Sequence, residues 1–162
     1  MANLEDENEV FIKHLIKTFV NDKNNIREFK YVIKNNYAII IDVYDGDTVT
    51  AVSFLEGHDD KLFKVKFRLD KIDTPEMRSR NPTEREYAIK AKEYLSNMVL
   101  NKLVYCEVNE TAKDQYGRLL TTLYVVDRDG KHPEKSVNQL MIDNGHARHY
   151  SGGHKEEWVF NK

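Results

Sequence analysis

The chain has a single cysteine and no long apolar run. Cys106 is the only thiol among 162 residues, so no disulfide can form within the chain. No apolar run approaches the roughly 20 residues that a membrane-spanning helix requires. The N-terminus, Met-Ala-Asn-Leu-Glu-Asp-Glu-Asn-Glu, is acidic where a secretory signal is basic and then apolar. We therefore expect an intracellular protein with no membrane association.

The chain also lacks an excess of positive charge. Its 25 lysines and arginines face 27 aspartates and glutamates, and the formal net charge of −2 argues against a passive DNA coat. Basic residues nevertheless crowd one part of the chain: Lys61, Lys64, Lys66, Arg68, Lys71, Arg78, Arg80, Arg85, Lys90 and Lys92. For any one lysine a solvated surface is the better interpretation. Around the acids described below, phosphate attraction explains the cluster better.

The length and the hydrophobic periodicity predict one domain with short appendages. Apolar residues at helical spacing predict an amphipathic helix over residues 8–20, and a further helix around 26–33 is a weaker expectation. We expect three parts: an N-terminal helical extension at 1–35, a folded domain at 36–150, and a C-terminal tail at 151–162. The helix in the extension could dock onto a partner protein or a second copy of the chain.

From Tyr37 the apolar period changes from helical to two, which is typical of strands. Strands are expected over 37–43, 47–54, 64–72, 103–108 and 119–126, and Asp45-Gly46 predicts a tight hairpin turn with positive φ at glycine. Asn81-Pro82 begins one helix, and Ser136 with Gln139 begins another that ends at Gly145. We therefore predict an α+β fold, a five-stranded barrel of oligonucleotide-binding (OB) type with packed helices.

Three short segments carry acids and a guanidinium: Asp45-Gly46-Asp47-Thr48, then Arg68, then Asp73-Thr74-Pro75-Glu76. Carboxylates suit a hard divalent cation, and a planar guanidinium suits a phosphate group. Taken singly, the aspartates could be turn-capping residues and Glu76 a loop acid. Together they predict a metal-dependent phosphodiesterase, in which Pro75 fixes the local path of the backbone and Glu76 orients an attacking water.

The ordered set DGDT, FRL, DTPE, D-x-YGR and VNQ resembles the staphylococcal nuclease, or thermonuclease-like, family over about residues 37–150. Arg68 and Glu76 stand eight positions apart, as in that family. The resemblance implies roles for the following residues: Asp47, Asp73 and the Thr74 carbonyl bind calcium, Glu76 acts on the attacking water, Arg68 and Arg118 bind the scissile phosphate, and Tyr116 and Tyr150 contact substrate. It also implies a DNA substrate, with RNA as a second, and endonucleolytic cleavage that leaves 3′-phosphates.

The chain departs from the family pattern in three places. Gln115 stands where lysine is usual, the segment between Asp47 and Arg68 is longer, and the third long helix is short or absent after Gly145. A zinc site built from His146, His149, His154 and Cys106 is the weaker alternative, because the chain has no second cysteine. An EF-hand is rejected, since DGD lacks the spaced acids of that loop. The main functional alternative is a catalytically silent nucleic-acid-binding module of the same fold.

Overall fold

The computed structural model describes residues 4–26, 32–112, 114 and 116–161. The chain divides into two compact units, residues 1–31 and 32–162, which are described separately. In the first unit, helix α1 spans Leu4–Asp22, so the helix predicted over 8–20 is present and longer than expected. The second expected helix, around 26–33, lies mostly outside the described residues. The three-part division predicted from sequence stays a prediction. No helix in the described part of the chain is long and apolar enough to cross a membrane.

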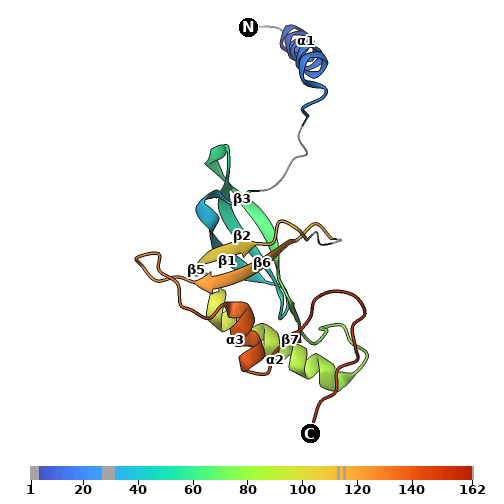
Figure 1. Cartoon of the computed structure of the whole chain (residues 1–162), viewed down its shortest axis with the longest axis vertical. Helices are drawn as coiled ribbons and strands as arrows, with labels where there is room; N and C mark the ends of the chain where they lie inside the picture. Colours follow the sequence, from blue (N-terminus) through green and yellow to red (C-terminus); the bar gives the residue numbers. More distant parts are fainter. Residues whose placement is uncertain (1–3, 27–31, 113, 115, 162) are drawn as a thin grey trace. The chain divides into compact units, whose positions relative to one another are not determined.

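The second unit is built on a closed five-stranded barrel (Figure 1). After a short 3-10 turn, η1 (Lys34–Asn36), the strands are β1 (Tyr37–Val43), β2 (Thr48–Leu55), β3 (His58–Leu69), β5 (Leu103–Val108) and β6 (Leu119–Val125). Their order around the barrel is β1-β2-β3-β6-β5. The β3–β6 pair is parallel and the other pairs are antiparallel. The predicted α+β fold with an OB-type barrel is confirmed.

The alternating pattern of the strands fills the inside of the barrel. Side chains with at most 1% exposure include Ile40 on β1, Val49 on β2, Phe67 on β3 and Leu123 on β6. Burying each such side chain contributes about 1.5–3 kcal/mol relative to leaving it in water. The barrel is thus a packed core, and it fixes the ends of its strands as a rigid frame for the site.

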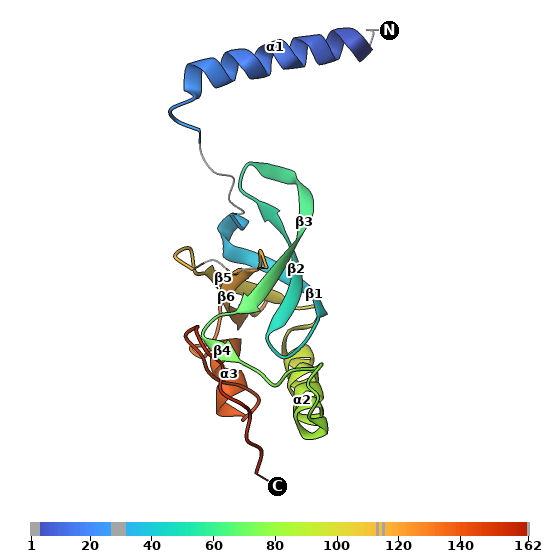
Figure 2. The same ribbon diagram turned by 90° about the vertical axis from the view of Figure 1, so that its right-hand side faces the viewer.

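Two helices cover one end of the barrel (Figures 1 and 2). α2 (Pro82–Val99) begins as predicted, because the Asn81 side chain accepts a hydrogen bond from the Thr83 amide and Pro82 occupies the first turn. Its apolar stripe, Ala88, Ala91, Leu95 and Val99, is buried. α3 (Val137–Asp143) begins at Ser136, which accepts from the Gln139 amide, whereas the Gln139 side chain donates to Asp143 and does not complete the expected capping box.

A second, two-stranded sheet was not predicted from the sequence. β4 (Ile72–Asp73) pairs antiparallel with β7 (Arg148–His149), and Asp73 lies opposite Arg148 in this register. Each strand has only two residues, which is too short to show a period. The pairing brings the chain that follows α3 back to the end of β3, and the Tyr150 amide donates to the Lys71 carbonyl there.

Candidate functional site

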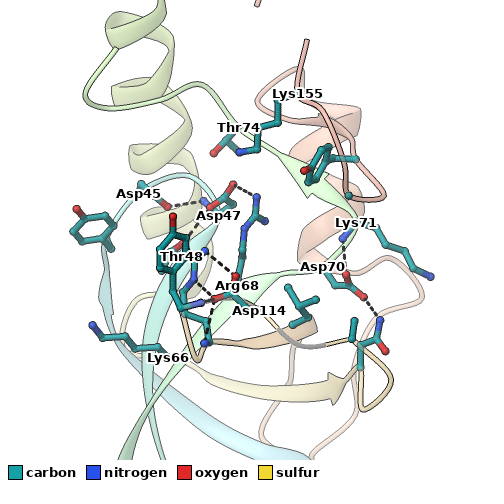
Figure 3. Close-up of a pocket in the computed structure, with 18 of the residues that line it drawn as sticks. Asp45, Asp47, Thr48, Lys66, Arg68, Asp70, Lys71, Thr74, Asp114 and Lys155 are labelled. Atoms are coloured by element: carbon teal, nitrogen blue, oxygen red, sulfur yellow. Dashed lines mark hydrogen bonds and ion pairs between the residues drawn. The ribbon is translucent and has the colours of Figure 1, made fainter. Parts of the chain in front are cut away.

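The candidate site is a cavity of about 1090 Å³ at the end of the barrel where β1–β2, β3–β4 and β5–β6 are connected. This volume is at the upper end of the range for small-molecule sites. Of the eight residues that the sequence proposed, seven line this cavity: Asp47, Arg68, Thr74, Glu76, Arg118, Tyr116 and Tyr150. The eighth, Asp73, is buried. Figure 3 shows the labelled members converging from these separate segments.

The β1–β2 loop supplies two neighbouring carboxylates. The Asp47 amide donates to Asp45 Oδ1 at 3.1 Å, and Asp47 is 6% exposed. Burial, reinforced by the charge of Asp47, raises the pKa of Asp45 to about 6. Two neighbouring carboxylates, one buried and one half-buried, favour a cation beside them, since a positive charge would relieve their repulsion.

Gly46 serves a different purpose from the one its sequence context predicted. Its φ is not in the positive range, so it does not supply a primed hairpin turn. Instead, a Cβ at this position would lie 2.9 Å from Thr74 Cβ and 3.0 Å from Ala91 Cβ. The loop is therefore packed directly against Thr74 and α2, and only glycine fits without displacement.

Arg68 projects from the end of β3 and is 9% exposed, so it is not the surface arginine that its outward register alone would indicate. Its Nη1 donates to the carbonyls of Leu69 and Ile72, both at 3.2 Å. Its Nη2 lies 3.3 Å from Asp47 Oδ2 and 4.0 Å from Asp73 Oδ1. The guanidinium thus links the two aspartates that the sequence proposed as metal ligands.

Arg118, at the start of β6, is held by a partner that sequence reasoning did not single out. Asp114 receives its Nε at 2.8 Å and its Nη2 at 3.2 Å. This hydrogen bonding lowers the pKa of Asp114 and raises that of Arg118. Arg118 Nη1 also donates to Thr48 Oγ1 at 3.0 Å, and Thr48 in turn donates to Asp47. The D-x-YGR motif already includes both Asp114 and Arg118. Their separation of four residues lets the carboxylate contact the guanidinium, so the motif itself was the signal for this pair.

Asp73 is 1% exposed and is surrounded by positive charge. Arg148, its neighbour on β7, donates to Asp73 Oδ2 at 3.0 and 3.2 Å. Lys155 Nζ lies 2.7 Å from Oδ1 without the alignment of a hydrogen bond, and Oδ1 accepts no hydrogen bond from the described residues, although Arg68 lies 4.0 Å away. Partial burial lowers the pKa of Lys155, but the close contact with the negative Asp73 carboxylate outweighs that effect, so the net shift of the pKa is upward.

Thr74 and Glu76 lie on the loop that joins β4 to α2. Thr74 is 4% exposed, whereas the Glu76 side chain is 63% exposed and faces the cavity, 3.5 Å from Lys155 Nζ. The Glu76 amide donates to the Glu84 carboxylate in the first turn of α2, which fixes the loop to the helix. Glu76 is therefore an exposed acid of the site, and its carboxylate is accessible to water.

The two proposed substrate tyrosines both reach the cavity. Tyr116 is 74% exposed, and its ring centroid lies 5.3 Å from Arg118 Cζ. The Tyr150 hydroxyl donates to the Gly153 carbonyl at 2.8 Å. Gln115, the departure from the family pattern, lies outside the described residues. The long β2–β3 hairpin does not extend the groove, because residues 55–63 are not among those that line the cavity.

The donor set fits a hard divalent cation in its chemistry. Asp45, Asp47, Asp73 and the Thr74 carbonyl offer only oxygen, as calcium prefers. The raised pKa of Asp45 favours a cation beside it, and Asp73 Oδ1 accepts no hydrogen bond from the described residues, although Arg148, Lys155 and Arg68 offset the charge of that carboxylate. In the described residues, however, no three His, Cys, Asp or Glu side chains lie close enough together to hold a metal ion. Lys155 lies 2.7 Å from Asp73 Oδ1, so a cation bound to that oxygen would compete with the ammonium.

The residues of the alternative zinc site are dispersed. Cys106 is fully buried on β5, where its Sγ donates to the Asn36 carbonyl and burial raises the pKa of the thiol to about 12. The His146 ring stacks on Tyr94, and His149 belongs to β7. Cys106 and His146 therefore have packing roles, whereas His149 and His154 are exposed.

Comparison with known proteins agrees with this architecture. The sequence model described as staphylococcal nuclease homologue matches residues 66–159. The thermonuclease of Staphylococcus intermedius is 26% identical over 113 residues, which are 70% of this chain and 63% of that protein, so this chain matches somewhat less than two thirds of its length. With the OB-type barrel, the clustered acids and the two site arginines, the match over more than half of the chain shows that this protein belongs to the staphylococcal nuclease homologue family.

Proposed function

We propose that this chain is a calcium-dependent nuclease that cleaves DNA, and RNA as a second substrate, within the strand and leaves 3′-phosphates. The observation that carries the proposal is the linked set Arg118–Thr48–Asp47–Arg68, in which each side chain contacts the next inside one cavity. Two guanidiniums beside buried carboxylates match a reaction that needs both a cation and donors for phosphate oxygens. Membership of a nuclease family supports the same reaction.

Each residue has a defined task in the proposed reaction. Asp45, Asp47, Asp73 and the Thr74 carbonyl would hold the cation, which supplies Lewis-acid stabilisation of the phosphate charge. Glu76 accepts a proton from the water that attacks phosphorus. Arg68 and Arg118 donate to the phosphoryl oxygens, whose negative charge grows in the transition state. The bond from phosphorus to the 5′-oxygen breaks, and that oxygen leaves with a proton from solvent.

The test is hydrolysis of single-stranded DNA with calcium and with chelator, using wild type, Glu76→Gln and Glu56→Gln. Glu56 follows β2 and lies outside the cavity, so it is the matched control. We expect calcium-dependent cutting that falls about 10²- to 10⁴-fold in Glu76→Gln and is unchanged in Glu56→Gln. DNA binding without cutting would instead establish the silent module. The same assay on RNA, with end-group analysis of the products, tests the second substrate and the 3′-phosphate.

We also propose that α1 pairs with α1 of a second copy of the chain. Phe11, Ile12, Leu15, Ile16 and Phe19 repeat at helical spacing and are each more than half exposed. Most acids of this helix lie in its first half, at Asp6, Glu7 and Glu9, and its lysines lie at its middle and in its second half, at Lys13 and Lys17, although Asp22 ends the helix. Antiparallel pairing would bury the apolar stripe and place opposite charges side by side.

Sedimentation across a concentration series tests this pairing. Leu15→Asp should abolish a concentration-dependent mass. Val10→Asp is the control, because Val10 is also exposed but lies about 140° away around the helix at 100° per residue. A monomer at all concentrations in the wild type would refute the pairing.

A further inference from the structure

The C-terminal segment, residues 151–160, is attached to the barrel unit at several points. The Trp158 and Phe160 rings stack with centroids 5.9 Å apart, and Phe160 stacks on Tyr87 of α2 at 4.3 Å. Arg148 lies over the Trp158 ring, 4.1 Å from Cζ to the centroid, and donates to the Glu156 carbonyl at 2.6 Å. Stacked aromatic pairs and a cation over indole each contribute on the order of 0.5–1.5 kcal/mol, so together they can hold a short segment in place.

This attachment carries Lys155 into the cavity. Figure 3 shows the lysine entering from the C-terminal segment. Its ammonium lies 2.7 Å from Asp73 Oδ1 and 3.5 Å from Glu76 Oε1, between a proposed metal ligand and the proposed base. Because the attacked phosphorus must lie next to the water that Glu76 orients, Lys155 stands within reach of the phosphoryl oxygens.

Besides the exposed Lys66 and Lys71, which also line the cavity, the cations around the site are more firmly committed to the protein. Arg68 donates to two main-chain carbonyls as well as facing Asp47. Arg118 is tied to both oxygens of Asp114 and to Thr48. Arg148 joins Asp73 to the C-terminal segment.

Lys155 differs from these arginines in its freedom to change partner. Its side chain is 39% exposed on a flexible four-carbon stem. A divalent cation at Asp73 would repel the ammonium and take over its carboxylate partner. Lys155 would then keep Glu76, 3.5 Å away, and the phosphate of the substrate would offer the ammonium a second negative partner in place of Asp73.

We propose that Lys155 is a substrate-binding residue of this site, that it takes a phosphate oxygen of the nucleic acid once a divalent cation occupies the carboxylates, and that the Arg148–Trp158 contact positions it. The inference rests on the proposed function for the identity of the ligand, a nucleotide phosphate. It assigns the C-terminal segment to the site, whereas the sequence predicted a separate tail.

Isothermal titration calorimetry of thymidine 3′-phosphate binding, in the presence of calcium, tests the inference without any cleavage. Lys155→Met should weaken binding about tenfold, the order expected for one charge-assisted hydrogen bond, and Lys155→Arg should retain most of the affinity. Lys135→Met is the matched control, because Lys135 pairs with Asp143 at 2.8 Å but lies outside the cavity. Its affinity should equal that of the wild type.

Trp158 is the only tryptophan of the chain, so its fluorescence reports whether the C-terminal segment stays attached. An unchanged spectrum in Lys155→Met would assign the loss to the ammonium itself. Trp158→Leu, which removes the contact with Arg148, should lower nucleotide affinity about as much as Lys155→Met. Unchanged affinity in Trp158→Leu would contradict the positioning role.

Two further results would overturn the inference. The first is a nucleotide affinity of Lys155→Met equal to that of the wild type. Lys155 would then be only a counter-ion of Asp73, whether or not the variant binds calcium more tightly than the wild type. The other is a wild type that binds no nucleotide. Failure of the proposed function is distinguishable: a protein that binds nucleotide through Lys155 yet cuts no DNA would refute the nuclease and retain this site.

Discussion

Gly46→Ala should destabilise the protein through the site itself. The added Cβ would lie 2.9 Å from Thr74 Cβ and Oγ1 and 3.0 Å from Ala91 Cβ, well inside the ordinary separation of about 3.5–4.0 Å between carbons. Both Cβ atoms are fixed directly to buried backbone, on the β4–α2 loop and on α2, so neither can rotate away. Overpacking of this kind typically costs about 1–3 kcal/mol. The φ of Gly46 is not positive, so no backbone strain is added.

Urea denaturation measures this cost as a shift of the midpoint with an unchanged slope. The same displacement moves Thr74 relative to Asp73 and Glu76, so nuclease activity should fall as well. A double-mutant cycle with Ala91→Gly isolates the collision: the two changes should couple by about 0.5 kcal/mol or more, because removing the Ala91 Cβ relieves part of the overlap. Wild-type stability in Gly46→Ala, or purely additive effects in the cycle, would refute the close-packing argument.

Three other perturbations probe the site and the core. Asp45→Asn in chelator should be more stable than the wild type at pH 7, by at most about 3 kcal/mol, because the folded pKa of about 6 lies above the ordinary aspartate value of 3.8. Protonated Asp45 contributes its full stabilisation below about pH 4, and this stabilisation is lost as the pH rises through 6. Urea denaturation at about pH 4 should therefore give nearly equal free energies of unfolding for Asp45→Asn and the wild type. Arg118→Lys should lower the rate constant for cleavage about 10²-fold, since lysine cannot contact Asp114 and Thr48 together; an unchanged rate would exclude Arg118 from the phosphate. Cys106 should react with a thiol reagent only after unfolding, and rapid labelling of the native protein would contradict its burial.

The barrel was predictable because its strands carry local signals. Alternation from Tyr37 to Val43 and the capping residues Asn81 and Ser136 are each visible in a short window of sequence, and the structure places elements there. Asp47 and Arg68 were predicted to share a site because a carboxylate suits a cation and a guanidinium suits the phosphate that the cation would face. In the structure Thr48 pairs with Arg68 across β2 and β3, which brings the two groups together.

The contacts of Asp73 could not be predicted in the same way. Its pairing with Arg148 joins residues 75 positions apart, through two strands of two residues each. Lys155 stands in a stretch of glycine and charged residues with no periodicity. No local pattern distinguishes such a stretch from a solvated tail. Its position depends on long-range contacts, of Trp158 with Arg148 and of Phe160 with Tyr87.

Three positive groups now face one buried carboxylate, and this balance constrains how the site can work. Arg148 and Lys155 contact the two oxygens of Asp73, and Arg68 lies 4.0 Å away. A buried aspartate held this way is stabilised without any metal, so the barrel can fold with its acids in place. A divalent cation must then replace one of these partners. Lys155 has the most exposed side chain of the three and the most flexible stem, so its departure costs least and releases one positive charge beside the substrate.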